Sequence, residues 1–172
     1  MHKQYVPIAV HMQAQVMTGI VSFPSGRRLS DFLNGDLTGQ PNRPCAFLEL
    51  NAVTIFHADG AKERLETIYI NTEAIRMLRT LEKDAARGIG ANDGPKQYPF
   101  VNKLPVRATM RMPGYEINGY LHCEDIQTAS QLLTQELAFL PCTDSRIHDI
   151  DGDKWWNAGF VAINRRQVHS LQ

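Results

Sequence analysis

The chain has 172 residues, 43% hydrophobic and 21% charged, which is the composition of a globular protein and excludes a disordered or membrane-spanning chain. Its 18 basic residues balance its 18 acidic ones, so the basic surface typical of nucleic-acid-binding proteins is not indicated. The three cysteines follow no metal-ligand spacing, and we expect neither disulfides, nor a metal, nor a cofactor. Without a secretory leader or an apolar run of about 18 residues, a cytoplasmic protein that does not enter the membrane is expected.

The first predicted elements are a hairpin and a short helix. Residues 6–12 and 16–22 mix apolar and polar positions around a short break, which predicts two paired strands. The apolar residues that follow have helical spacing, with Ser30 as a cap and Gly35 as a stop.

Two further strands, a helix and a loop are predicted next. AFLELNAVTIFHADG, residues 46–60, predicts one or two strands that end in an Asp-Gly turn, the strongest short signal for a hairpin. Residues 66–71 predict the partner strand. After Asn71 a short turn and then a final short strand or helix is predicted. In the first copy the apolar spacing from Thr72 favours a helix that ends at Gly88, and turn-forming residues after it predict a loop.

The same pattern of apolar positions and turns occurs twice along the chain. Three shifts in residue number align the copies in the same order: 100 for Gly19 and Gly119, 92 for Phe47 and Phe139, and 93 for Asn71 and Asn164. The sequence therefore predicts a tandem duplication, with a first unit at 1–78, a helix extension and linker at 79–105, and a second unit at 106–172.

Each unit is predicted to be β-rich α+β, with about five strands and one short helix. Short strands expose their edges, and closure hides them, so we expect a small, strongly curved sheet or barrel in each unit. Gly19 and Gly119 predict a bulge or a sharp bend in the second strand. Asn71 and Asn164 predict side-chain caps on the turns that follow them.

Three short sequence motifs mark the first unit. The first unit contains Ser30-Asp31-Phe32-Leu33-Asn34, Phe47-Leu48-Glu49-Leu50 and Ile70-Asn71 followed by Ile75. This pattern resembles a family of short bacterial domains of unknown function, here in tandem. The second unit keeps Phe139-Leu140 and Ile163-Asn164 but has lost much of the first motif. The order of elements is more distantly similar to SH3-like or Sm-like barrels, which bind peptides or RNA and often assemble; this is an analogy of fold only.

Two arginine pairs are candidate anion sites. Arg27 and Arg28 precede the predicted first helix, where free N–H groups favour negative charge. Arg165 and Arg166 follow the last long strand of the second unit. Together they predict a phosphate-binding or nucleic-acid-binding surface, against the alternative that the arginines are solvated or paired with nearby acids.

Trp155 and Trp156 are candidate interface residues. Neighbouring residues in a strand face opposite ways, so one tryptophan is predicted in the core and the other facing outward. An outward tryptophan near a hairpin tip would anchor a protein interface. The alternative is that it covers the core of the other unit.

No catalytic residue is predicted. The segment His148–Asp153 is rich in ligand atoms, but its glycine and acid spacing does not match a calcium loop, and a hairpin turn is favoured. His57 with Asp59, or His148 with Asp149, would need a nucleophile beside them.

The predicted function is a non-catalytic binding or assembly module that engages a protein partner or itself. The alternative is a regulatory RNA- or nucleotide-binding protein that uses the two arginine pairs. An enzyme with a site between the units is the third interpretation.

The arginine alternative predicts a specific loss. Replacing Arg165 and Arg166 with alanine is expected to weaken polyanion binding and flatten its dependence on salt, because fewer counterions are displaced. Titration of a labelled oligonucleotide at several salt concentrations measures both effects, and unchanged binding would contradict the arginine surface.

Overall fold

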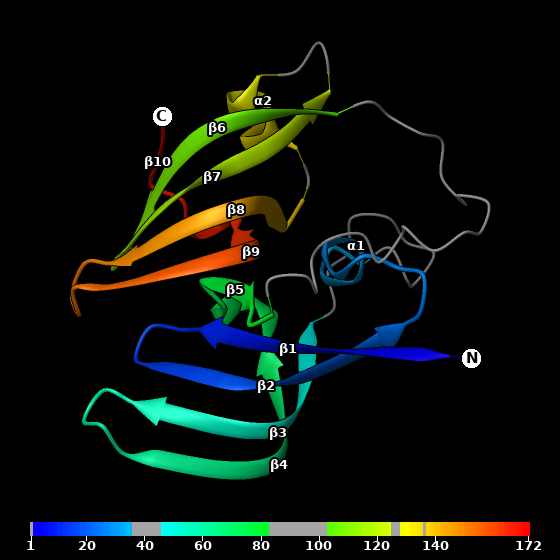
Figure 1. Cartoon of the computed structure of the whole chain (residues 1–172), viewed down its shortest axis with the longest axis vertical. Helices are drawn as coiled ribbons and strands as arrows, with labels where there is room; N and C mark the ends of the chain where they lie inside the picture. Colours follow the sequence, from blue (N-terminus) through cyan, green and yellow to red (C-terminus); the bar gives the residue numbers. More distant parts are fainter. Residues whose placement is uncertain (1, 36–45, 83–102, 125–127, 136) are drawn as a thin grey trace.

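The structure, a computed structural model, describes residues 2–35, 46–82, 103–124, 128–135 and 137–172 (Figure 1). Its first-half elements are β1 (Lys3–His11), β2 (Gln15–Pro24), α1 (Leu29–Leu33), β3 (Phe47–His57), β4 (Lys62–Asn71), a 3-10 turn (Thr72–Ala74) and β5 (Met77–Thr80). Its second-half elements are β6 (Lys103–Met112), β7 (Tyr115–Glu124), α2 (Ala129–Thr134), β8 (Phe139–Asp149), β9 (Lys154–Asn164), a 3-10 turn (Arg165–Gln167) and β10 (Ser170–Leu171). The described elements follow the same order in both halves, as a tandem duplication would produce.

The ten described strands form one antiparallel sheet in the order β10-β6-β7-β8-β9-β5-β1-β2-β3-β4. Each half contributes five neighbouring strands, and in each the last strand lies beside the first: β5 beside β1, and β10 beside β6. The halves meet in the ladder where β5 pairs with β9, with Leu78 opposite Ala162. Figure 1 shows the two halves stacked along the long axis of the molecule, with β5 and β9 at the centre.

The prediction of a β-rich α+β fold made of two strongly curved, barrel-like units is wrong. The described structure is almost all sheet, with α1 and α2 as short helices. The sheet is open, and β4 and β10 are its outer strands. The second edge of β5 is occupied by β9 of the other half, so the ladder continues from one half into the next and does not close within either. Strand content is encoded locally, whereas the choice of partner for an edge is not, and this is why the sequence did not reveal the open sheet.

The helix predicted from Thr72 is also wrong over the described residues. A single 3-10 turn is followed by β5, which pairs with β1 on one edge and β9 on the other. Ile75 and Leu78 fit a helical face as well as a strand, and both are completely buried. Hydrogen bonding on both edges decides for the strand. The rest of that helix and most of the following loop, residues 83–102, lie outside the described residues.

The helices differ from prediction in detail. In α1 the N-cap position is held by Arg28, without a side-chain hydrogen bond, so Ser30 is not the cap. Gly35 follows the helix with a φ of 88°, as expected of a glycine stop. The helix of the second half, α2, spans Ala129–Thr134, and residues 125–127 and 136 lie outside the described chain.

The predicted hairpins, bulges and caps are confirmed. The strand pairs β1–β2 and β3–β4, and their counterparts β6–β7 and β8–β9, are antiparallel hairpins. The register shifts at Gly19 and again at Gly119. The side chain of Asn71 accepts a hydrogen bond from the Glu73 N–H at 3.0 Å, and that of Asn164 accepts one from the Arg166 N–H at 3.1 Å.

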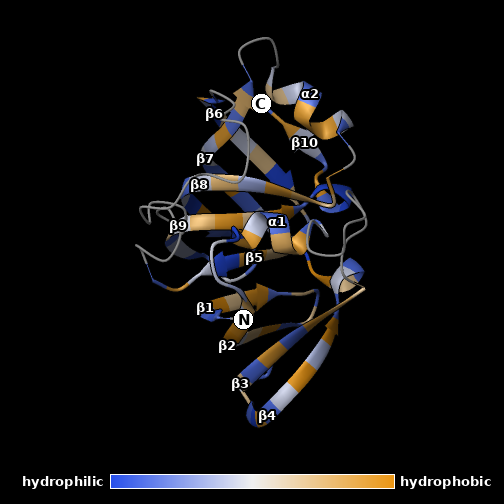
Figure 2. Ribbon diagram, turned by 90° about the vertical axis from the view of Figure 1, so that its right-hand side faces the viewer, coloured by the Kyte–Doolittle hydropathy of each residue, from blue (hydrophilic) through white to orange (hydrophobic). Residues whose placement is uncertain are grey.

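Apolar and polar residues alternate along the strands (Figure 2), and the buried apolar side chains form two cores. The first core consists mainly of first-half residues, but it also takes in Phe139, Phe160 and Ala162 from the second half. The second core consists of second-half residues and Met77 of β5. The β5–β9 pairing therefore carries side chains from each half into the core of the other.

The bulge at Gly119 predicts a destabilised variant. A Cβ atom there would lie 2.6 Å from Cys142 Sγ and 3.0 Å from the carbonyl oxygen of Thr143. Gly119→Ala is therefore expected to lower the free energy of unfolding by about 1–3 kcal/mol, measured by urea denaturation. The control is Gly152→Ala, whose Cβ would meet only the flexible end of the Asp149 side chain. Equal stability of the two variants would contradict the close packing at the bulge.

Candidate functional site

A buried polar cluster lies where the two halves meet. His11, at the end of β1, has no exposed surface, and its Nδ1 lies 3.2 Å from the hydroxyl of Tyr115 on β7. Arg79 of β5 donates from Nε to His11 Nε2 at 3.2 Å. Arginine has only donors, so Nε2 accepts, and the proton on Nδ1 is donated to Tyr115. Trp156 of β9 packs edge-on against the His11 ring, with centroids 5.4 Å apart.

Burial sets the protonation of this cluster. Burial is the larger cause and the nearby charge of Arg79 the smaller one, and together they lower the pKa of His11 to about 3. Burial also raises the pKa of Tyr115, with Asp149 contributing in the same direction. Both groups are therefore neutral at pH 7. Both ring nitrogens of His11 are engaged in hydrogen bonds with Tyr115 and Arg79. The cluster therefore links the two halves, and we call it the buried joint.

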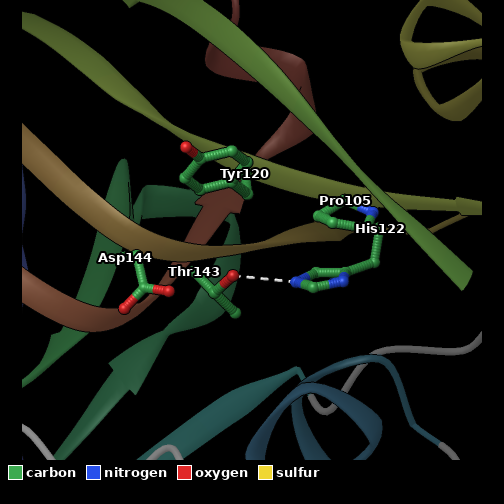
Figure 3. A pocket seen from close by; sticks show the side chains of 5 residues that line it. All are labelled: Pro105, Tyr120, His122, Thr143 and Asp144. Carbon is green, nitrogen blue, oxygen red and sulfur yellow. Dashed lines mark hydrogen bonds between the residues drawn. The ribbon is translucent and has the colours of Figure 1, made fainter.

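A shallow groove lies on the second half, over β6, β7 and β8 (Figure 3). It is lined by Pro105, Tyr120, His122, Thr143 and Asp144. His122 Nε2 lies 2.8 Å from the hydroxyl of Thr143, the hydrogen bond drawn in the figure. Asp144 has a φ of 47°, in the left-handed region, beside the bulge opposite Gly119.

The groove presents polar groups to solvent. Partial burial lowers the pKa of His122, Lys103 and Arg28 lower it as well, and Asp144 opposes them. A neutral imidazole, a hydroxyl and a carboxylate can together hold a small polar ligand. A histidine bonded to a threonine is not by itself an activated nucleophile, which needs a group to orient the base and donors for an oxyanion.

The four candidate arginines have different surroundings. Arg165 donates to the carbonyl oxygens of Leu133 and Gln135, at the end of α2. Arg166 forms an exposed ion pair with Glu73 of the first half, at 3.2 Å. Arg28 is the N-cap residue of α1 and Arg27 precedes it. Anion binding by the two pairs stays a prediction. Arg165, one member of the second pair, is already hydrogen-bonded to backbone carbonyls at the end of α2.

The two tryptophans face opposite ways, as the strand pattern predicts. Trp156 is partly buried and packs against the second core. Trp155 is 46% exposed, its ring stacks on that of His148 with centroids 3.9 Å apart, and the Arg146 guanidinium lies 4.3 Å from its centre. Trp156 therefore covers the junction, and Trp155 is the outward member of the pair. Its role as an interface anchor stays a prediction.

The acidic segment after β8 is a hairpin turn. Asp149 Oδ1 accepts from the Gly152 N–H at 3.0 Å, and His148 lies 3.2 Å from Asp153. Within the described parts of the chain, no group of three or more histidine, cysteine, aspartate or glutamate side chains is arranged to hold a metal ion.

The open edge of the sheet carries two aromatic side chains that the sequence did not single out. Tyr69 of the outer strand β4 is 65% exposed, and Phe47 of β3 is 58% exposed. Phe47 lies opposite Asn71 and Tyr69 opposite Glu49, so the two rings lie two rungs apart, on the same face and at the same end of the β3–β4 hairpin. The signal in the sequence was an aromatic residue at a strand position that faces solvent. Only the register of the strands shows that these positions face solvent.

Comparisons with protein-family models, with curated proteins and with solved structures found no match to this chain. In the described residues, no helix is both long and apolar enough to cross a membrane.

The buried joint predicts a dependence of stability on pH. His11 has a pKa of about 3 in the folded protein, against 6.5 when exposed, so between these values only the unfolded chain is protonated. Stability is fully present above pH 6.5 and falls as the pH is lowered, by about 2 kcal/mol from pH 7 to pH 5. His11→Gln is expected to remove this pH-dependent loss of stability. The free energy of unfolding of both proteins is measured by urea denaturation at pH 7 and at pH 5. His122 shifts in the same direction but is present in both proteins, so it cancels in the comparison. An identical pH dependence in the variant would contradict a neutral, buried His11.

Proposed function

We propose that the protein is a non-catalytic binding or assembly module that engages a protein partner through the outer strand β4. The observation that supports this is the exposed aromatic pair, Tyr69 on β4 and Phe47 on the adjacent β3, at a sheet edge that pairs with no other described strand. Soluble proteins normally keep such edges short, charged or covered, because an open strand pairs readily with another chain.

Both kinds of contact that strand addition needs are available at β4. The outer edge of the strand offers backbone N–H and C=O groups, which supply affinity when a further strand is added. The aromatic side chains supply apolar area and specificity. The other end of β4 carries charges that oppose indiscriminate pairing: Lys62, Glu63, Arg64 and Glu66. The end near Tyr69 is therefore the docking region.

Binding of RNA or a nucleotide is the second candidate. The observation in its favour is that Arg28 and Lys103 both act electrostatically on His122, so positive charge lies near the groove. Asp144, also in the groove, opposes an anion there. The edge of the sheet is therefore the better-supported site.

Photo-crosslinking from the edge tests the proposal. A benzoylphenylalanine at Tyr69 is expected to form adducts with a protein in living cells, because the docked partner would cover this side chain. The control is the same probe at Tyr5, which is 68% exposed but belongs to β1, separated from β4 by two strands. Discrete protein adducts at position 69 and not at position 5 support docking at β4. Equal labelling, or no adduct at position 69, would count against it.

A further inference from the structure

The first core is completed by residues from the other half of the chain. Phe139, Phe160 and Ala162 belong to β8 and β9, yet they are buried in the first core, with exposures of 2%, 8% and 0%. They reach it because β9 pairs with β5. The β8–β9 hairpin of the second half therefore covers the side of the first core that would otherwise be open.

The second core has no equivalent cover among the described residues. The alignment of the two halves places Phe47, Thr67 and Tyr69 at the positions of Phe139, Phe160 and Ala162. All three are exposed on the first half. In the described chain, Met77 is the first-half residue buried in the second core. The side chains that could provide the cover lie on the opposite end of the sheet.

Burial around the open side of the second core follows the same asymmetry. Its apolar residues are only half-buried, whereas their counterparts in the first half are at most 3% exposed. The pairs are Val106 with Val6, Leu133 with Leu33, Val168 with Ile75, and Leu171 with Leu78. The four positions are thus buried in the first half, where a hairpin of the other half docks. They stay partly exposed in the second half, where no described hairpin docks.

We propose that a second copy of this chain covers the second core, pairing its β4 with β10 in the register of the β9–β5 junction. The inference rests on the proposed function and names the partner. In the junction, Leu78 lies opposite Ala162 and Met77 opposite Ile163. A shift of 93 residues converts these pairs into Leu171 opposite Tyr69 and Ser170 opposite Ile70.

β10 is hydrogen-bonded to β6 in the same way as β5 is to β1, so the outer edges of β10 and β5 have equivalent positions. The His169 N–H donates to the Arg111 carbonyl at 2.8 Å, and the corresponding Arg76 N–H donates to the His11 carbonyl at 2.9 Å. The two last strands thus lie in the same way on the first strand of their half. The edge that β5 offers to β9 has its equivalent in β10.

Polar contacts of the junction also have equivalents. Asn164 donates its side-chain N–H to the Ile75 carbonyl at 2.8 Å across the junction. Its counterpart Asn71 is exposed and would reach the Val168 carbonyl of the second copy. The exposed ion pair of Arg166 with Glu73 would recur with the partners exchanged, because these two residues are each other's counterparts. Such a pair adds specificity more than affinity.

The proposed contact is head-to-tail. Each chain uses the β4 edge on one side and the β10 edge on the other, so the two surfaces differ and one contact leaves a free edge of each kind. Assembly is therefore not limited to two chains.

Sedimentation velocity of the full chain over a range of concentrations tests this. The wild type is expected to exceed the monomer mass of 19.4 kDa as concentration rises. Tyr69→Lys would place an ammonium group in the second core of the neighbour, and association is expected to weaken ~10-fold or more. Tyr5→Lys, at a side chain of similar exposure, should assemble as the wild type does.

A mixing experiment tests the head-to-tail arrangement. Leu171→Lys blocks the β10 edge, and Tyr69→Lys blocks the β4 edge. Each variant alone should remain monomeric, whereas an equimolar mixture should form a dimer of one chain of each, since each supplies the edge that the other lacks. Self-association of Leu171→Lys but not of Tyr69→Lys would mean that β4 pairs with β4, and would overturn the proposal.

Crosslinking separates this inference from the proposed function and does not require that Leu171→Lys fold. In the purified wild-type background, a benzoylphenylalanine at Tyr69 should label a second copy at residues 168–172 or on α2. A monomeric wild type at about 100 µM, with position 69 labelling a different protein in cells, would overturn self-assembly and leave docking at β4 intact. If position 69 formed no adduct in the purified protein or in cells, both self-assembly and docking at β4 would be contradicted.

Discussion

The pairing of β5 with β9 is the interaction on which the rest of the structure depends. β5 has only four residues, Met77–Thr80, yet it is hydrogen-bonded on both edges and joins two five-stranded halves into one sheet. The same pairing carries β8 and β9 side chains into the first core. It also brings His11 of β1 next to Tyr115 and Trp156 of the second half, where burial keeps the imidazole neutral. A change at this junction would therefore affect both cores and the polar joint together.

An open ladder built from two similar halves has an unavoidable consequence. One junction between the halves uses one edge of each, so one edge of each remains: β4 on the first half and β10 on the second. The two differ in character. β4 is a ten-residue strand with the exposed Tyr69 near one end and charges at the other, whereas β10 is a two-residue strand. The charged end limits pairing with unrelated chains, and the aromatic end remains available.

Local features of the fold could be predicted because their causes are local. The hairpins follow from alternation and turn residues, and the bulges at Gly19 and Gly119 from a position where any Cβ would meet the neighbouring strand. Asn71 and Asn164 cap turns that lie two residues away. The functional features could not be predicted in the same way. The Tyr115 hydroxyl and His11 are 104 residues apart, and His122 and Thr143 are 21 apart on different strands, so no spacing in the sequence connects them.

The sequence by itself determined where the long hairpin strands lie, where they turn, and which glycine and asparagine positions shape them, because these depend on side-chain alternation and backbone preferences within a few residues. Tertiary structure alone decided that residues 77–80 form a strand and not a helix, that β5 pairs with β9 and leaves the sheet open, and that Phe47 and Tyr69 remain exposed. The physical reason is that a strand edge offers the same N–H and C=O groups to every candidate partner. Which one it takes is settled by the side chains that the pairing buries, and these come from distant parts of the chain.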